Sequence, residues 1–311
     1  MSVAEPDPTA HTALVLEGTS SRVVLAGSTP EAVRTKRLGP GMWLAFAWCG
    51  LLAFIVLLAP YLPFIKDPDE PSRFIEQGPS TTNWFGTDQL GRDVFARVAW
   101  GGRVSLAIGF GALILGFLIG GVLGITAGFF RGRYERVVMG AMDIMLSFPS
   151  LILALALLSA LSPPGETAGS LGKVTFVLTV LAIPALARIT RANTLTYSER
   201  EFVTAARAMG SKPRRTLTSE ILPNVLPSMI SFSFVALAIL VVAEGALAFL
   251  GLSVEAPAAT WGKLIQSGSE KLDDAPHLAL IPCAVMFFTL LSLNYIGDRL
   301  QARFSSRESA L

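Results

Sequence analysis

The sequence predicts an all-α integral membrane protein with six transmembrane helices and both termini in the cytoplasm. Three observations indicate this fold class: the composition, a series of long stretches almost free of charge, and an uneven distribution of Lys and Arg. Of the 311 residues, 52% are hydrophobic and 15% are charged, whereas soluble domains carry roughly 25% charged residues. The net charge of +2 is too small to indicate a nucleic-acid partner.

Five stretches are long and apolar enough to cross a bilayer. A helix rises about 1.5 Å per residue, so roughly 20 residues span the hydrocarbon core. The five runs are Leu38–Ile65, Val104–Phe130, Val137–Pro164, Val225–Val254 and Leu278–Gly297. The third run contains one acid, Asp143, and the fourth contains one, Glu244. These five runs are expected to be membrane spans.

A sixth span is predicted over Val174–Ala187, although this run is short, ends at Arg188 and contains Pro184. Taken alone, it also suits a re-entrant or interfacial segment. Short loops rich in Lys and Arg remain in the cytoplasm. With six spans, 17 Lys and Arg residues lie on one side and 8 on the other. Without this span, the basic segment 188–224 would lie outside, so six helices are favoured.

The spans divide the chain into segments. Residues 1–41 form a polar cytoplasmic tail that is expected to be disordered, with an interfacial helix as the alternative. The first transmembrane helix follows at 42–62, and an external loop occupies 63–103. The core of five further helices occupies 104–304, and a second cytoplasmic tail occupies 305–311.

A ladder of small residues lies in the second span. Gly116, Gly120, Gly124 and Gly128 recur every four residues, so they share one helix face. Small residues at this spacing let two membrane helices approach closely. The ladder predicts helix packing without a chemical role.

The segment 198–224 lies on the cytoplasmic side and predicts a helical hairpin. Ser198 and Glu201 have the spacing of a capping box. A first helix then carries an apolar stripe and ends at a left-handed Gly210. The stripe consists of Phe202, Ala205, Ala206 and Met209. Ser211 is expected to cap a second helix, which Pro223 ends.

Three interpretations of this hairpin are open from the residues alone. A basic helix-turn-helix can bind DNA, but here both ends continue directly into membrane spans. A basic loop can also serve topology only. That interpretation leaves the exposed apolar stripe unexplained, because such a stripe requires a partner surface. A protein partner on the cytoplasmic side is therefore expected.

The hairpin resembles the EAA loop of the membrane subunits of bacterial ABC importers. Thr204, Ala205 and Ala206 occupy the E-A-A positions, Gly210 follows after three residues, and Leu222-Pro223 closes the pattern. The sequence departs from the pattern at Thr204, which replaces the Glu, and at Glu220, which replaces an Ile. The resemblance implies ATPase coupling through Glu201, Phe202, Thr204, Ala205, Ala206, Arg207, Met209, Gly210 and Arg214.

Further segments resemble the C-type permease subunit of dipeptide and oligopeptide ABC importers, over about residues 40–304. They are Phe85–Asp93, Asp143–Pro149, Phe249–Leu252 and Trp261-Gly262. The resemblance implies the type I importer transmembrane-domain fold in the bacterial cytoplasmic membrane. It implies a homologous B-type permease, two ATPase subunits or one ATPase homodimer, an external substrate-binding protein and a peptide substrate as partners. Nickel, glutathione and haem are alternative cargoes of similar permeases.

No phosphate-binding motif of the form G-x-x-x-x-G-K-[ST] occurs in the sequence. The chain is therefore not expected to bind the nucleotide itself, and the resemblance implies that ATP and Mg are bound by the partner ATPases. Because no His, Cys or carboxylate cluster has metal-ligand or catalytic spacing, the chain is expected to be non-catalytic and to hold no cofactor or metal. A self-contained ion-coupled secondary transporter is the alternative from another class, and a membrane-embedded enzyme is a third. The transporter would need an intramembrane titrating group and an internal repeat.

The two acids in the apolar runs are candidate functional residues, because ionisable groups at membrane depth are rare. For Asp143, a structural position near the cytoplasmic end of its span is the alternative to a place in the translocation path. For Glu244, path lining and an interhelical contact are both open. The predicted path residues are Asp143, Ser147, Phe148 and Glu244.

Overall fold

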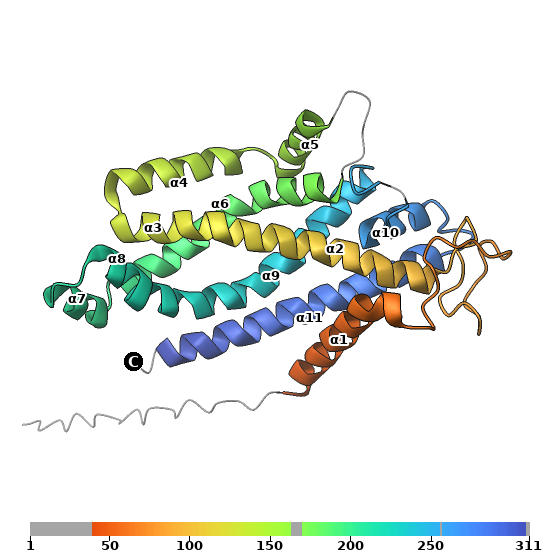
Figure 1. The fold of residues 1–311 in the computed structure, drawn as a ribbon, viewed down its shortest axis with the longest axis horizontal. Helices are drawn as coiled ribbons and strands as arrows, with labels where there is room; N and C mark the ends of the chain where they lie inside the picture. The colour runs from red at the N-terminus through yellow and green to blue at the C-terminus, as the bar shows by residue number, and fades with distance from the viewer. Residues whose placement is uncertain (1–38, 163–169, 256, 309–311) are drawn as a thin grey trace, which may run out of the picture. The chain divides into compact units, whose positions relative to one another are not determined.

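The structure is a computed structural model that describes residues 39–162, 170–255 and 257–308. Over these residues the chain is helical, and no β-strand is formed among them. The expected tail at 1–41 lies almost entirely outside the described residues, as do the last three residues of the tail at 305–311. The helices are α1 (Pro40–Leu58), α2 (Val94–Gly116), α3 (Val122–Phe130), α4 (Gly132–Ser147), α5 (Ser150–Leu161), α6 (Leu171–Ser198), α7 (Glu201–Ala208), α8 (Pro213–Arg215), α9 (Leu222–Phe249), α10 (Trp261–Ser269) and α11 (His277–Glu308) (Figure 1).

Short helical segments join several of these elements into longer rods. A 3₁₀ turn, η1 (Ala59–Tyr61), extends α1, a π-helical turn, η2 (Phe117–Gly121), joins α2 to α3, and another, η3 (Thr216–Ile221), joins α8 to α9. Five helices are therefore long and apolar enough to cross a membrane. They are Pro40–Tyr61, Val94–Phe130, Leu171–Ser198, Pro213–Phe249 and His277–Phe304. The all-α multi-pass membrane fold is confirmed.

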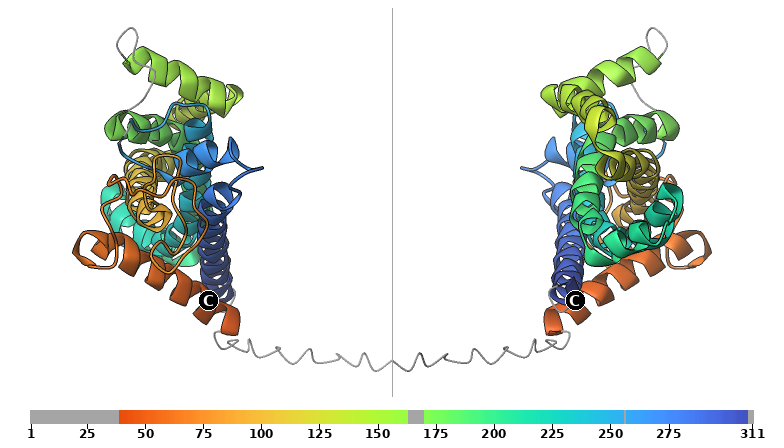
Figure 2. Two further views of the ribbon diagram at one scale, coloured as in Figure 1. Left: turned by 90° about the vertical axis from the view of Figure 1, so that its right-hand side faces the viewer. Right: turned by 90° about the vertical axis from the view of Figure 1, so that its left-hand side faces the viewer.

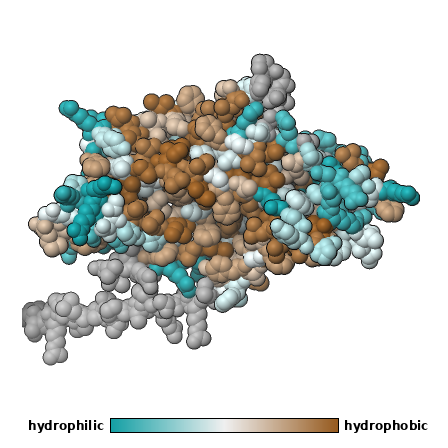
Figure 3. Space-filling view, viewed as in Figure 1, coloured by the Kyte–Doolittle hydropathy of each residue, from teal (hydrophilic) through white to brown (hydrophobic). Residues whose placement is uncertain are grey.

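The long helices lie side by side, with α1 against α11 and α2, and with α4 and α5 against α6 (Figures 1 and 2). Apolar side chains cover the middle of the face seen in Figure 3, and hydrophilic residues gather at its two ends. The main core joins α2, α6, α9, α10 and α11 around side chains such as Ile108, Leu178, Leu237 and Trp261. This distribution is typical of a protein whose middle lies in hydrocarbon.

The third predicted span is not one helix. It consists of α4 and α5, which are bent by 93° at a short break. Pro149 disfavours the helical conformation of the residue before it, and Phe148 has an extended ψ of 135°. A continuous helix over Val137–Pro164 was therefore a wrong expectation, and this bent pair is the sixth span when it is counted as one.

The fourth span is longer than its apolar run indicated. Helix α6 covers Leu171–Ser198, contains Pro184 and includes Arg188. Its first turn is capped by the hydroxyl of Ser170, which accepts from the N–H of Lys173. The run of 174–187 underestimated the helix because charged residues continue it at both ends. The choice of a full span over an interfacial segment agrees with this length.

The external loop is shorter than the predicted 63–103, because α2 begins at Val94. The carboxylate of Asp93 accepts a hydrogen bond from the N–H of Ala96 at 2.9 Å and caps the helix. The error arose because Arg97 and Arg103 end the charge-free run although both lie inside α2. Arg97 is nevertheless buried and pairs with Asp69 at 3.2 Å and with Asp88 at 3.6 Å.

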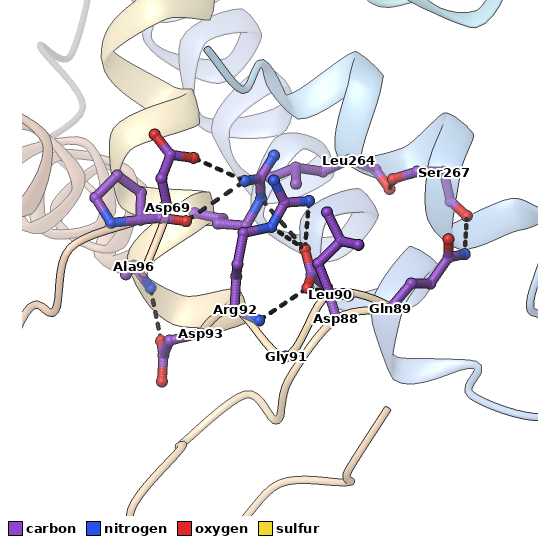
Figure 4. Close-up of polar contacts among 12 residues, drawn as sticks. Asp69, Asp88, Gln89, Leu90, Gly91, Arg92, Asp93, Ala96, Leu264 and Ser267 are labelled. Atoms are coloured by element: carbon purple, nitrogen blue, oxygen red, sulfur yellow. Dashed lines mark hydrogen bonds and ion pairs between the residues drawn. The ribbon is translucent and has the colours of Figure 1, made fainter. Parts of the chain in front are cut away.

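A network of polar contacts gives this external loop a fixed shape (Figure 4). Asp88 forms a salt bridge of 2.8 Å with Arg92 and also accepts from the backbone N–H of Leu90. Gly91 has a φ of +77°, and a Cβ there would lie 2.4 Å from the carbonyl oxygen of Ser72. The Gln89 amide donates to the carbonyl of Ser267 in α10. The loop is thereby attached to both α2 and α10.

The four glycines of the ladder all face α6. A Cβ at Gly120 would lie 2.6 Å from the carbonyl oxygen of Ile183, and one at Gly124 would lie 2.3 Å from that of Ala187. Gly116 lies against Leu186, and Gly128 lies against Thr194. The backbones of the two helices therefore approach more closely than any side chain would allow.

We predict that Gly120→Leu separates these helices and destabilises the chain, because the larger side chain meets backbone atoms that cannot move aside. Overpacking of this kind typically costs about 1–3 kcal/mol. The thermal unfolding midpoint of the purified protein in detergent should fall measurably. Gly50→Leu in α1 is the control, because a Cβ at Gly50 meets no atom within 4 Å. Equal midpoints for the two variants would contradict the close packing of Gly120.

Candidate functional site

The cytoplasmic hairpin lies at the end of the bundle where α6 ends and α9 begins (Figure 1). Helix α7 follows α6 after a turn, and the residues from Pro213 onward continue into the long helix that ends at Phe249. Both ends of α7 are thus connected to membrane helices through short segments.

One face of α7 holds the hairpin to the rest of the chain. Val203 is 0% exposed and Ala206 is 7% exposed. Val203 packs in a small core with Ile125 of α3 and with Ile221 and Val225 of the η3–α9 segment. Val203 was not among the predicted residues, although its hydrophobic side chain lies three residues before Ala206 and so on the same helix face.

The other face of α7 is exposed and partly apolar. Phe202 is 40% exposed and Met209 is 83% exposed, and Ala205 is also exposed. These three residues have the helical spacing of one face. The predicted stripe therefore loses Ala206, which faces the chain's own core. The remaining predicted coupling residues Glu201, Thr204, Arg207, Gly210 and Arg214 are all exposed.

Gly210 ends α7 with the left-handed geometry expected from the sequence. Its φ is +82°. The N–H of Ser211 donates to the carbonyl of Ala206 and the N–H of Gly210 donates to that of Arg207, both at 3.0 Å. This pair of bonds is the Schellman motif, which requires a positive φ that glycine adopts most readily.

The helix starts of the hairpin differ from the prediction. Helix α6 continues through Ser198, so Ser198 is not a cap, and the N-cap of α7 is Arg200 without a side-chain bond. The capping box was a wrong expectation because the preceding span did not end where its apolar run ended. The second helix is capped at Lys212, not at Ser211, whose hydroxyl accepts instead from that of Thr216.

Pro223 does not end the second helix of the hairpin, contrary to the prediction. It lies at the start of α9, directly after the π-helical turn Thr216–Ile221. A proline is tolerated in the first turn of a helix, because the amides there have no partner within the helix. The π turn before α9 changes the helical hydrogen-bond pattern at this point, so Pro223, which has no N–H, fits within a continuous helix. The second part of the hairpin therefore continues into α9 as one helical span.

The guanidinium of Arg207 lies 5.3 Å from the ring centroid of Phe129 in α3. The side chain of Arg131, just beyond the same helix, donates to Glu199 at 2.9 Å. These contacts tie the cytoplasmic end of α3 to α7 and to the turn that precedes it. The exposed face of α7 is thus presented by a supported helix.

Glu244 is fully buried, with an exposure of 0%. It accepts hydrogen bonds from the hydroxyls of Ser253 at 2.7 Å and Ser105 at 3.1 Å, and the Ser105 hydroxyl accepts from the N–H of Trp261 at 3.0 Å. These bonds join α9, α2 and the start of α10. Of the two alternatives for Glu244, the structure shows an interhelical contact.

Asp143, Ser147 and Phe148 lie on the exposed side of α4 and its break. Asp143 pairs with Arg188 of α6. The hydroxyl of Ser147 donates to the carbonyl of Ile144 at 2.6 Å, and Phe148 is 54% exposed. Arg188 was missed as a partner because it served only as the end of the short apolar run. Both residues of the pair lie a few helical turns from the cytoplasmic ends of their helices. This similar depth was the signal in the sequence that could have identified Arg188 as the partner of Asp143.

Comparisons with known proteins agree on one family. Residues 120–309 match the family described as the binding-protein-dependent transport system inner membrane component. The chain is 32% identical over 252 residues to a glutathione transport system permease protein of Pectobacterium atrosepticum, covering 81% of this chain and 82% of the relative. It is 33% identical over 255 residues to a dipeptide transport system permease protein of Alkalihalophilus pseudofirmus, again covering 81% and 82%.

A solved structure supports the same fold. An inward-facing structure of a methionine ABC transporter matches with a TM-score of 0.56 and 22% identity, covering 68% of this chain and 96% of the matched chain. At this identity, the likeness concerns the fold alone. With the family match over more than half of the chain and two relatives above 30% identity, the chain belongs to the inner-membrane permease components of binding-protein-dependent ABC importers.

Proposed function

We propose that this chain forms half of the translocation path of an ATP-driven importer and that the exposed face of α7 docks in a groove of an ATPase subunit. The observation that carries the proposal is the apolar face of Phe202, Ala205 and Met209, which stays exposed on a helix fixed to the bundle. An amphipathic helix seated in an apolar groove is a common mode of protein recognition. The chain itself is then non-catalytic, and ATP and Mg bind to its partners.

The proposed assembly contains a homologous second permease, two ATPase subunits or one ATPase homodimer, and an external substrate-binding protein. Family membership supports the ATPase and the binding protein as partners. The cargo is proposed to be a di- or oligopeptide, because two relatives are named for dipeptide and glutathione transport. Glutathione is itself a peptide and is the nearest alternative.

We predict that Ala205→Glu uncouples transport while leaving the chain in the membrane. The charge would enter the interface in place of a small apolar group, and uptake of a labelled dipeptide or glutathione should fall about tenfold, which corresponds to about 1.4 kcal/mol of lost binding. Uptake by vesicles that contain the complete complex is the measurement. Ala302→Glu, the same change at another exposed position near the end of α11, is the control. Wild-type uptake and ATPase assembly in Ala205→Glu would refute the docking face.

A second prediction separates ATP-driven transport from the ion-coupled alternative. Glu244→Gln should retain most ATP-dependent uptake, because the amide oxygen still accepts from one serine hydroxyl and the amide NH₂ can donate to the oxygen of the other, while the charge is removed. Glu244→Leu should lower both stability and uptake, since it leaves buried hydroxyls unpaired at a cost of about 1–3 kcal/mol each. Thermal unfolding and uptake are measured together.

A different set of results would support the ion-coupled alternative. Uptake by the reconstituted chain alone, driven by a proton or sodium gradient without nucleotide and abolished by Glu244→Gln, would overturn the importer function. In that case the carboxylate would titrate during transport, as ion-coupled carriers require.

A further inference from the structure

The ion pair between Asp143 and Arg188 is exposed in the middle of an apolar region. The Asp143 side chain is 58% exposed and the Arg188 side chain is 51% exposed. Nearby residues of α4 are apolar and also exposed, with Ile144 at 65% and Val137 at 72%. A half-exposed pair of charges thus interrupts a surface that otherwise suits hydrocarbon.

The depth of the pair follows from helix geometry. Asp143 lies about two turns, or roughly 10 Å, beyond Arg136 of the basic cytoplasmic turn. Arg188 lies roughly 15 Å before the end of α6 at Ser198. Helices α4 and α6 lie side by side (Figure 1), so both estimates place the pair deeper along the bundle than the basic cytoplasmic turn. A second pair, Arg191 with Glu135, lies nearer the cytoplasm.

Contact with lipid hydrocarbon is energetically unfavourable for this pair of charges. Charged side chains at membrane depth face a bundle interior or water, because burial in hydrocarbon costs several kcal/mol even for favourable cases. Glu244 satisfies this rule because it is completely buried and its carboxylate accepts hydrogen bonds from two hydroxyl groups. Asp143 and Arg188 are covered by no part of the described chain to that extent, so either water or a partner subunit must face them.

An apolar groove lies next to the pair along the chain. The groove, of about 200 Å³, is formed by α5, α6 and α9 and is lined by residues that include Ser150, Ala154, Ala185 and Ala236. Ser150 follows the break after Ser147, and Ala185 lies about one helical turn from Arg188. The same side of the chain therefore offers both charge signs and an adjoining apolar surface.

We propose that the Asp143–Arg188 pair lines a water-filled passage through which a zwitterionic cargo moves. A peptide carries an ammonium and a carboxylate at its ends and apolar side chains between them, which fits a wall with both charges beside an apolar groove. An exposed pair of charges is bound weakly, so it can exchange partners with a cargo and release it. This inference rests on the proposed function, because it assigns a part of that transport path.

The test begins with the accessibility of position 147. In the complete complex in membrane vesicles, the native Cys49 and Cys283 are replaced by Ser, and Ser147→Cys is introduced. Charged, membrane-impermeant methanethiosulfonates should modify this cysteine, with and without ATP and Mg²⁺ in the sample. Phe54→Cys in α1, at a site of 51% exposure on a helix without charged residues, is the lipid-facing control and should stay unmodified.

The charge near the pair is then measured by comparing how readily a cationic and an anionic methanethiosulfonate modify the cysteine at position 147. Arg188→Gln leaves Asp143 unpaired and should favour the cationic trimethylammonium reagent, whereas Asp143→Asn leaves Arg188 and should favour the anionic sulfonate. Each preference should change about fivefold, the effect of one unit charge at about 4 Å in water. Glu135→Gln changes a residue about three turns from position 147 along α4 and frees the charge of Arg191. Arg191 lies about one turn of α6 farther from position 147 than Arg188, so the preference should change less than in Asp143→Asn because of distance and screening.

Two results would overturn the inference. The first is a cysteine at 147 that stays unmodified, which would mean that lipid or a second permease covers this face. The second is a preference that does not shift in opposite directions in the two charge variants. ATP-driven uptake by the same vesicles is measured in parallel, so loss of the passage assignment with intact uptake leaves the importer function standing.

Discussion

The close backbone contact between the α2–α3 rod and α6 is the constraint on which the rest of the structure depends. Membrane helices gain no hydrophobic free energy by associating in lipid, so close packing and hydrogen bonds must hold them together. At Gly120 and Gly124 the carbonyl oxygens of α6 occupy the space of a side chain. This contact fixes α6 beside the rod over several turns and so determines where α7 begins.

The cytoplasmic hairpin is placed by this packing and by the continuity of α9. Val203 joins the ends of α3 and α9, and Arg207 lies over Phe129 of α3. Because Pro223 is accommodated after a π turn, the helix from Pro213 to Phe249 is continuous from the hairpin into the membrane region. A continuous connection of this kind is compatible with the ATPase coupling that we propose for α7.

Two acids in the apolar runs have opposite environments. Glu244 is satisfied inside the chain by hydroxyl groups of Ser105 and Ser253, and it joins three helical elements near the folded external loop. Asp143 has a cationic partner but remains open on one side. A buried carboxylate that is hydrogen-bonded to hydroxyl groups holds helices in one arrangement. An exposed ion pair, in contrast, can exchange partners with water or a solute.

The sequence by itself determined the membrane fold, the presence and order of the long apolar helices, the glycine face and the left-handed turn at Gly210. Each of these depends on local properties: chain length in hydrocarbon, spacing on a helix and backbone freedom. Only the tertiary structure decided the bend at Phe148, the start of α2 at Val94 and the hydrogen-bond and ion-pair partners of Glu244 and Arg188. Those features depend on side chains from distant segments, such as the Asp69 and Asp88 carboxylates that hold Arg97 inside a helix. Charge counting along a chain cannot reveal such partners, because it registers a charge and not the group that neutralises it.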